Sequence, residues 1–210
     1  MHKKIKLQSK RNSVYRIVTD NGTYISKKFN SIEDYNKEKE ILNILTGAGV
    51  RVPSIISSQN NSLYMKDLGD FTLLRWYEEQ EKNNTLDEKL LYKLSFWLRD
   101  FYKAVYNHYN EEIILHDINF RNFIIFESEI YGIDFEQVRQ GSICEDIGRF
   151  SAYALTYHPV MTRWKIYFRN KFIDILSKEL KIKKENIVAE ENKELLAIEK
   201  RRGISLVIRR

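Results

Sequence analysis

The feature that most constrains this chain is the segment 113–138, in which short apolar runs are bracketed by polar side chains. Within it, residues 123–133 form two apolar runs separated by three polar residues, a pattern that predicts a tight β-hairpin. Asp117 and Asn122 precede the hairpin, and Asp134 follows it. Because both ends of a hairpin lie together in space, we expect these three oxygen-bearing side chains to converge at one edge.

This set of side chains suits a metal-nucleotide site. Mg²⁺ prefers hard oxygen ligands, and it takes only one or two of them from protein when phosphates supply the rest. In kinase phosphoryl transfer, a loop aspartate orients the attacking hydroxyl, an asparagine five residues later binds metal, and a later aspartate binds metal again. Asp117, Asn122 and Asp134 reproduce that order and spacing.

At these residues the chain resembles the protein-kinase-like fold, and within it the aminoglycoside/choline phosphotransferase branch. That branch carries Asp-Phe-Glu where protein kinases have Asp-Phe-Gly, and Asp134-Phe135-Glu136 matches it. Gly141 and Asp146 stand at the branch's next two characteristic positions. The resemblance covers roughly residues 12–150, and it implies that Asp146 hydrogen-bonds the backbone of the catalytic loop.

The resemblance implies an α+β fold with two lobes. We expect residues 1–68 to form an N-lobe, a small antiparallel sheet with one helix that binds nucleotide. Residues 69–210 then form a mainly helical C-lobe with the catalytic loop and the acceptor site. The implied activity is an ATP-dependent kinase that moves the γ-phosphate to a hydroxyl acceptor, with a small molecule as the expected acceptor. In it, Asp117 is catalytic, and Asn122 and Asp134 bind Mg²⁺.

The nucleotide lysine is predicted on a strand over residues 23–29, after an Asn-Gly turn. Side chains alternate along a strand, so Lys27 shares a face with Ile25 and Phe29, while Lys28 points to solvent. We therefore expect Ile25 to line the adenine pocket and Lys27 to reach the phosphates.

A helix is predicted over residues 31–45, with Ser31 as its N-cap. In the resembled fold this helix offers a glutamate to the strand lysine. Glu38 is the first choice, because it precedes the apolar pair at positions 41 and 42 by three and four residues. Glu40 and Glu33 are the alternatives.

The remaining helices are predicted from apolar periodicity. A long helix is expected over 85–110, opened by a capping box that begins at Thr85. Residues 149–180 are expected to be largely helical with a break at Pro159, and a charged helix is expected over 190–202.

Composition sets wider limits. Of the 210 residues, 43% are hydrophobic and 30% charged, as in an ordinary globular protein. The single cysteine excludes an intrachain disulfide, no apolar run reaches the length of a membrane span, and no apolar leader follows the first residues. We therefore expect a cytoplasmic protein that does not enter a membrane. The net charge of +6 suits anionic ligands such as nucleotide or RNA.

Two alternatives remain open. The basic segment 200–210 resembles the tail of the small kinase/ATPase that works within a tRNA-modification complex, where it would contact an RNA or protein partner. The second alternative is a nucleotide-binding pseudokinase. It is favoured by the absence of a Gly-rich loop at 9–13 and by Leu115, which stands where the family has histidine. His116, next to it, is expected to have no catalytic role.

Overall fold

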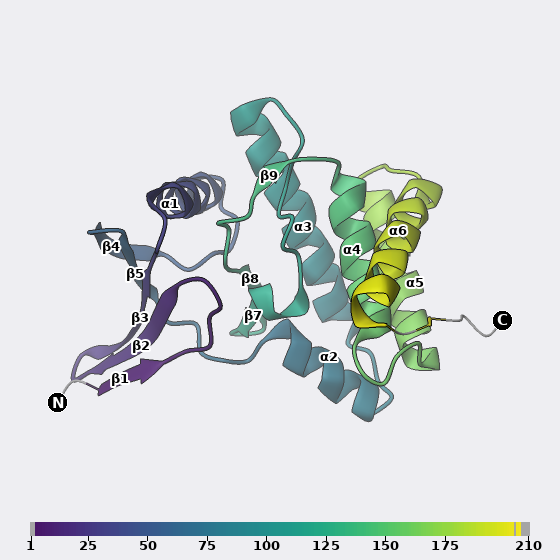
Figure 1. The fold of residues 1–210 in the computed structure, drawn as a ribbon, viewed down its shortest axis with the longest axis horizontal. Coiled ribbons are helices and arrows are strands. Elements are labelled where there is room, and N and C mark those ends of the chain that lie inside the picture. The colour runs from purple at the N-terminus through teal and green to yellow at the C-terminus, as the bar shows by residue number, and fades with distance from the viewer. Residues whose placement is uncertain (1–2, 204, 207–210) are drawn as a thin grey trace.

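The computed structural model describes residues 3–203, 205 and 206. It has an antiparallel sheet with one helix at one end and a mainly helical body at the other (Figure 1). The protein-kinase-like α+β fold predicted from the sequence is confirmed. The segment around Gly69 joins the two parts, and Gly69 has a φ of +81° there.

The sheet has five strands in the order β1-β2-β3-β5-β4, and every neighbouring pair is antiparallel. The predicted turn connects β2 to β3, and Gly22 takes its φ of +123°, which side-chain-bearing residues rarely adopt. The strands are β1 Lys3–Lys6, β2 Ser13–Thr19, β3 Gly22–Lys28, β4 Ile55–Gln59 and β5 Ser62–Lys66.

Helix α1 (Ile32–Gly47) follows β3 directly. Ser31 caps it as predicted, because its side chain accepts the backbone N–H of Asp34 at 3.2 Å. The inward face of α1 is buried and carries Glu38 together with Ile41, Leu42 and Leu45. This packing fixes Glu38 relative to the sheet.

The body contains a hairpin that lies against α3 (Figure 1). Its turn residues Glu127 and Ser128 have φ values of 50° and 61°, as a tight two-residue turn requires. Phe120, just before the hairpin, stacks on Phe150 of α4 with ring centroids 4.0 Å apart. The elements are α2 Leu73–Lys82, α3 Glu88–Tyr109, β6 Ile113–Ile114, η1 Phe120–Asn122, β7 Phe123–Phe126, β8 Glu129–Gly132, β9 Arg139–Gln140, α4 Ile143–Thr156, α5 Arg163–Glu179 and α6 Lys184–Arg202.

The predicted capping box at Thr85 is wrong. Helix α3 begins three residues later, and Asp87 is its N-cap, accepting the backbone N–H groups of Lys89 and Leu90. Thr85 belongs to the turn that ends α2, since its N–H donates to the carbonyl of Gln80 at 3.0 Å.

A capping box does occur at the start of α4, between Ser142 and Glu145. Helix α6 begins at Lys184, six residues before the predicted start, because Ile187 is fully buried and extends the packed face. Within the described residues, no helix is long and apolar enough to span a membrane.

Candidate functional site

The site is built around Lys27 of β3. Its Nζ lies 2.7 Å from Glu38 of α1, 2.7 Å from Asp134 and 3.2 Å from Glu136. Glu38 and Glu136 are buried, whereas the side chain of Asp134 is 39% exposed. One ammonium therefore joins the sheet, α1 and the segment after the hairpin.

Burial and charge act together in this cluster. Burial alone would lower the pKa of Lys27, but the charges of Glu38, Asp134 and Glu136 outweigh it and raise that pKa. The pKa of Glu38 is raised to about 7, mainly by burial. The charge of Lys27 lowers this pKa, and the negative charges of Asp134 and Glu136 raise it again. The cluster thus holds more negative than positive charge, as expected for a place that receives cations.

The structure shows which of the candidate glutamates contacts the strand lysine. Glu38 contacts Lys27, whereas Glu40 accepts the hydroxyl of Tyr109 at 2.9 Å and Glu33 is exposed. Lys28 is exposed, as the alternation predicted. Ile25 is half-buried on β3, and its assignment to an adenine pocket stays a prediction.

The loop that carries Asp117 is held by Asp146. Its carboxylate accepts the backbone N–H of Leu115 at 2.6 Å and that of His116 at 3.0 Å. The resemblance to the kinase-like family implied that Asp146 would hold this loop by hydrogen bonds to its backbone. Burial raises the pKa of Asp146 to about 6, and these two hydrogen bonds oppose the rise.

His116 is held in place by contacts with α4. Its φ is 61°, and Arg149 of α4 lies 3.1 Å from its Nδ1 and donates to its carbonyl. Leu115, which stands where the resembled family has histidine, is buried, and its backbone is anchored by Asp146. The loop therefore keeps its shape without that histidine.

A backbone hydrogen bond closes the base of the hairpin, so its two ends lie together as the pattern predicted. The N–H of Ile133 donates to the carbonyl of Asn122 at 2.9 Å, which ties the exit of the hairpin to its entrance. Asp134 has a φ of 68°, an uncommon value for a residue with a side chain. Strained backbone of this kind often occurs at functional sites.

Asp117 lies on the same loop and is exposed. Asn119 donates to its Oδ1 at 3.2 Å, and the side-chain NH₂ of Asn122 donates to its carbonyl at 2.8 Å. Since that amide nitrogen is used, the amide oxygen of Asn122 is left for another partner.

The donor set fits a magnesium ion. Carboxylate oxygens of Glu38, Asp134 and Glu136 lie within 4.8 Å of one another. Asp134 has one oxygen beyond the one that contacts Lys27. Asn122 carries a neutral side-chain oxygen, and its backbone is hydrogen-bonded to Ile133, the residue before Asp134. Hard oxygen ligands of this type suit Mg²⁺ when phosphates complete the coordination.

Sequence reasoning did not assign a role to Glu136 or Asn12. The side chain of Asn12 donates to Glu136, and its oxygen accepts the N–H of Asn30 at 3.2 Å. Asn12 lies in the β1–β2 loop, where nucleotide phosphates are covered in the resembled fold. The available signal was the triplet Asp134-Phe135-Glu136 itself, which places a second acid two residues after Asp134.

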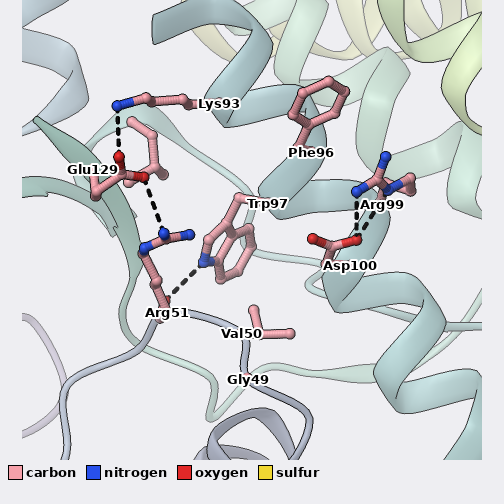
Figure 2. A pocket seen from close by; sticks show the side chains of 10 residues that line it. Gly49, Val50, Arg51, Lys93, Phe96, Trp97, Arg99, Asp100 and Glu129 are labelled. Atoms are coloured by element: carbon pink, nitrogen blue, oxygen red, sulfur yellow. Dashed lines mark hydrogen bonds and ion pairs between the residues drawn. The ribbon is translucent and has the colours of Figure 1, made fainter.

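A separate hollow of about 210 Å³ lies between the hairpin and α3 (Figure 2). Figure 2 shows Glu129 between Lys93 and Arg51, with contacts of 2.5 Å and 3.4 Å, and Trp97 donating to the carbonyl of Arg51 at 2.7 Å. No predicted site residue lines this hollow. These polar contacts tie the hairpin to α3 and to the segment before β4.

Comparison with known proteins identifies a family and a fold. The family model of the RIO domain matches residues 1–142. Among solved structures, the amicoumacin kinase hAmiN, in complex with AMP-PNP, Ca²⁺ and Ami, has a TM-score of 0.63 at 14% identity, covering 97% of this chain and 82% of that one. The kinase PK-1 of Cydia pomonella granulovirus has a TM-score of 0.48 at 13% identity, covering 63% of this chain and 52% of that one. No curated protein matches this sequence significantly.

Proposed function

This chain belongs to the RIO-domain family, and on that premise we propose that it transfers the γ-phosphate of ATP to a hydroxyl group of a small molecule. The family and the kinase fold support an ATP-dependent phosphotransferase in general. We further propose that the acceptor is a small molecule, that the site residues have the roles given below, and that the protein is cytoplasmic.

The observation that carries the proposal is the contact of Lys27 with both Glu38 and Asp134 at 2.7 Å. A lysine held by a helix glutamate and a metal-binding aspartate is the arrangement that kinases use to position phosphates. In this role Lys27 binds the α- and β-phosphates, and Glu38 orients Lys27.

Asp117 is the proposed catalytic residue. Its carboxylate orients the acceptor hydroxyl, whose oxygen forms a bond to the γ-phosphorus as the bond between that phosphorus and the ADP oxygen breaks. The hydroxyl proton passes to Asp117 and then to solvent, and the products are ADP and a phosphate ester. Asn122 and Asp134 would hold Mg²⁺, which offsets the phosphate charge when it is bound.

The anchored loop favours an active enzyme over a pseudokinase. The loss of the family's histidine would matter if the loop needed it, but Asp146 holds the N–H groups of Leu115 and His116 directly. Asp117, Asn122 and Asp134 are all present. A small-molecule acceptor is in keeping with the amicoumacin kinase, whose structure holds a nucleotide and Ami.

A transfer screen tests the proposal. The protein is incubated with Mg²⁺ and ATP labelled on the γ-phosphate, together with hydroxyl metabolites, antibiotics or cell extract. The Asp134→Ala variant serves as the background. Magnesium-dependent labelling of a small compound supports the proposal. Nucleotide binding without any turnover would favour the pseudokinase, and labelling of protein or RNA alone would favour a role in a modification complex.

A further inference from the structure

The catalytic loop carries an arginine whose guanidinium has no ion-pair partner in the part of the chain that the structure describes. Arg121 lies in η1, between Asp117 and Asn122, and is exposed. Its backbone N–H donates to the side chain of Asn119 at 2.9 Å, and Asn119 in turn donates to Asp117 at 3.2 Å. The backbone is therefore fixed beside Asp117, while the charged end of Arg121 remains available.

A second arginine, at the end of α6, contacts the C-terminal end of α4. Arg202 ends α6 and donates to the carbonyl of Thr156 at 2.7 Å. The next residue, Tyr157, packs edge-on against Phe120 in η1, with ring centroids 5.3 Å apart. Tyr157 is thus the point where the end of α6 meets the catalytic loop.

The charges of both arginines act at Tyr157. Burial raises the pKa of its hydroxyl to about 12, and Arg121 and Arg202 both oppose that rise. Arg121 directly follows Phe120, and Arg202 contacts the residue before Tyr157, so both arginines adjoin the contact between Phe120 and Tyr157.

Two further arginines nearby already have partners. Glu194 of α6 lies 3.4 Å from Arg149 and 2.6 Å from Arg201. Arg149 also contacts His116, so this group ties α6 to the catalytic loop. Arg149 and Arg201 are thus engaged with Glu194, whereas Arg121 and the exposed Arg202 have no carboxylate partner among the described residues.

We propose that Arg121 and Arg202 bind a phosphate or carboxylate group of the acceptor while the acceptor hydroxyl meets Asp117. The acceptor is then a small hydroxyl compound that carries an anionic group. This inference rests on the proposed phosphotransfer function. A catalytic carboxylate repels an anionic substrate, and nearby guanidinium groups offset this repulsion and bind such groups in a fork geometry. RNA binding draws on several cations along a path, whereas the proposed site uses two arginines.

The test compares matched pairs of compounds: glycerol with glycerol 3-phosphate, glucose with glucose 6-phosphate, and glycerol with glycerate. Binding is measured by calorimetry on the full chain, with the nucleotide site saturated by Mg²⁺ and a non-hydrolysable ATP analogue. The variants are Arg121→Gln and Arg202→Gln. Lys103→Gln, which removes an exposed positive charge from α3, is the control. Circular dichroism checks that each variant is folded.

We expect at least one anionic compound to bind about tenfold or more tightly than its neutral partner. Arg121→Gln and Arg202→Gln should each remove most of that preference and leave nucleotide affinity intact, and Lys103→Gln should preserve both. The anionic compound should also be the better phosphate acceptor in the labelled-ATP assay.

Four results would overturn the inference. They are equal binding of the paired compounds, a preference that survives Arg121→Gln, a loss of nucleotide affinity in Arg121→Gln, and binding of single-stranded RNA alone. A loss of nucleotide affinity would mean that Arg121 binds the nucleotide, and binding of RNA alone would mean that the arginines bind RNA. A preference that depends on Arg121 without any phosphate transfer would leave the anion site standing while the proposed function failed.

Discussion

Replacing Lys27 by methionine should reveal how strongly the acidic cluster depends on one cation. The substitution keeps the length of the side chain but leaves Glu38 and Glu136, both buried, without an ammonium. Removing one partner of a buried ion pair costs about 3–5 kcal/mol. Asp134 adds less, because its side chain is 39% exposed and solvent screens its charge. We therefore expect a loss of about 3–5 kcal/mol in the free energy of unfolding near pH 7.

The pH dependence of the free energy of unfolding follows from the titration of Glu38. Its folded pKa is about 7, above the unfolded value of 4.5, so the protein loses stability as pH rises between these values. In Lys27→Met that pKa rises further, because the favourable charge of Lys27 is gone. Lys27→Met therefore continues to lose stability as the pH rises above 7, whereas the parent protein does not. The difference between the two proteins should grow by about 1.4 kcal/mol for each pH unit above 7, up to the variant's own pKa.

Urea unfolding of both proteins at pH 6, 7, 8 and 9 measures this difference. Lys28→Met is the matched control, since Lys28 is the exposed neighbour on the same strand, and it should change stability by about 0.5 kcal/mol or less. Equal effects of the two substitutions, or a difference that stays constant above pH 7, would refute the account of the cluster.

Two further predictions concern the metal and the packing of the body. Asp134→Ala should abolish magnesium-dependent nucleotide binding, because it removes the exposed carboxylate of the cluster; undiminished binding by calorimetry would refute the metal assignment. Gly148→Ala should cost about 1–3 kcal/mol, because its Cβ would lie 2.6 Å from the backbone nitrogen of Glu191 in α6. Gly47→Ala, where a Cβ meets nothing within 4 Å, should leave the urea midpoint unchanged or slightly raised, and similar effects of the two would contradict this packing.

The sequence predicted the convergence at the hairpin because local rules determine it. Alternation along β3 separates Lys27 from Lys28, and a two-residue turn forces the ends of the hairpin together. Glu38 could be chosen over Glu40 because it stands at helical spacing from the buried pair Ile41 and Leu42. The functional roles of these residues stay predictions.

What the sequence did not predict depends on contacts between distant segments. The hydrogen bond between Asn12 and Glu136 joins residues 124 positions apart, and no local pattern marks it. The start of α3 was misplaced because Thr85 and Asp87 are both good N-caps, and only the turn that ends α2 decides between them. The basic tail was predicted as one segment, but residues 204 and 207–210 lie outside the described structure. Arg202 contacts the carbonyl of Thr156 in α4, and Arg201 pairs with Glu194 of its own helix.

The measurement that tests the central claim most directly compares Asp117→Asn with the parent protein. Nucleotide affinity and the initial rate of phosphate transfer are measured side by side, at saturating nucleotide and with an acceptor from the screen. The side chain keeps its size but loses its charge. We therefore expect nearly unchanged nucleotide affinity and a transfer rate lower by about 10²–10⁴-fold. A folded variant that transfers phosphate at the parent rate would contradict the claim that Asp117 is catalytic.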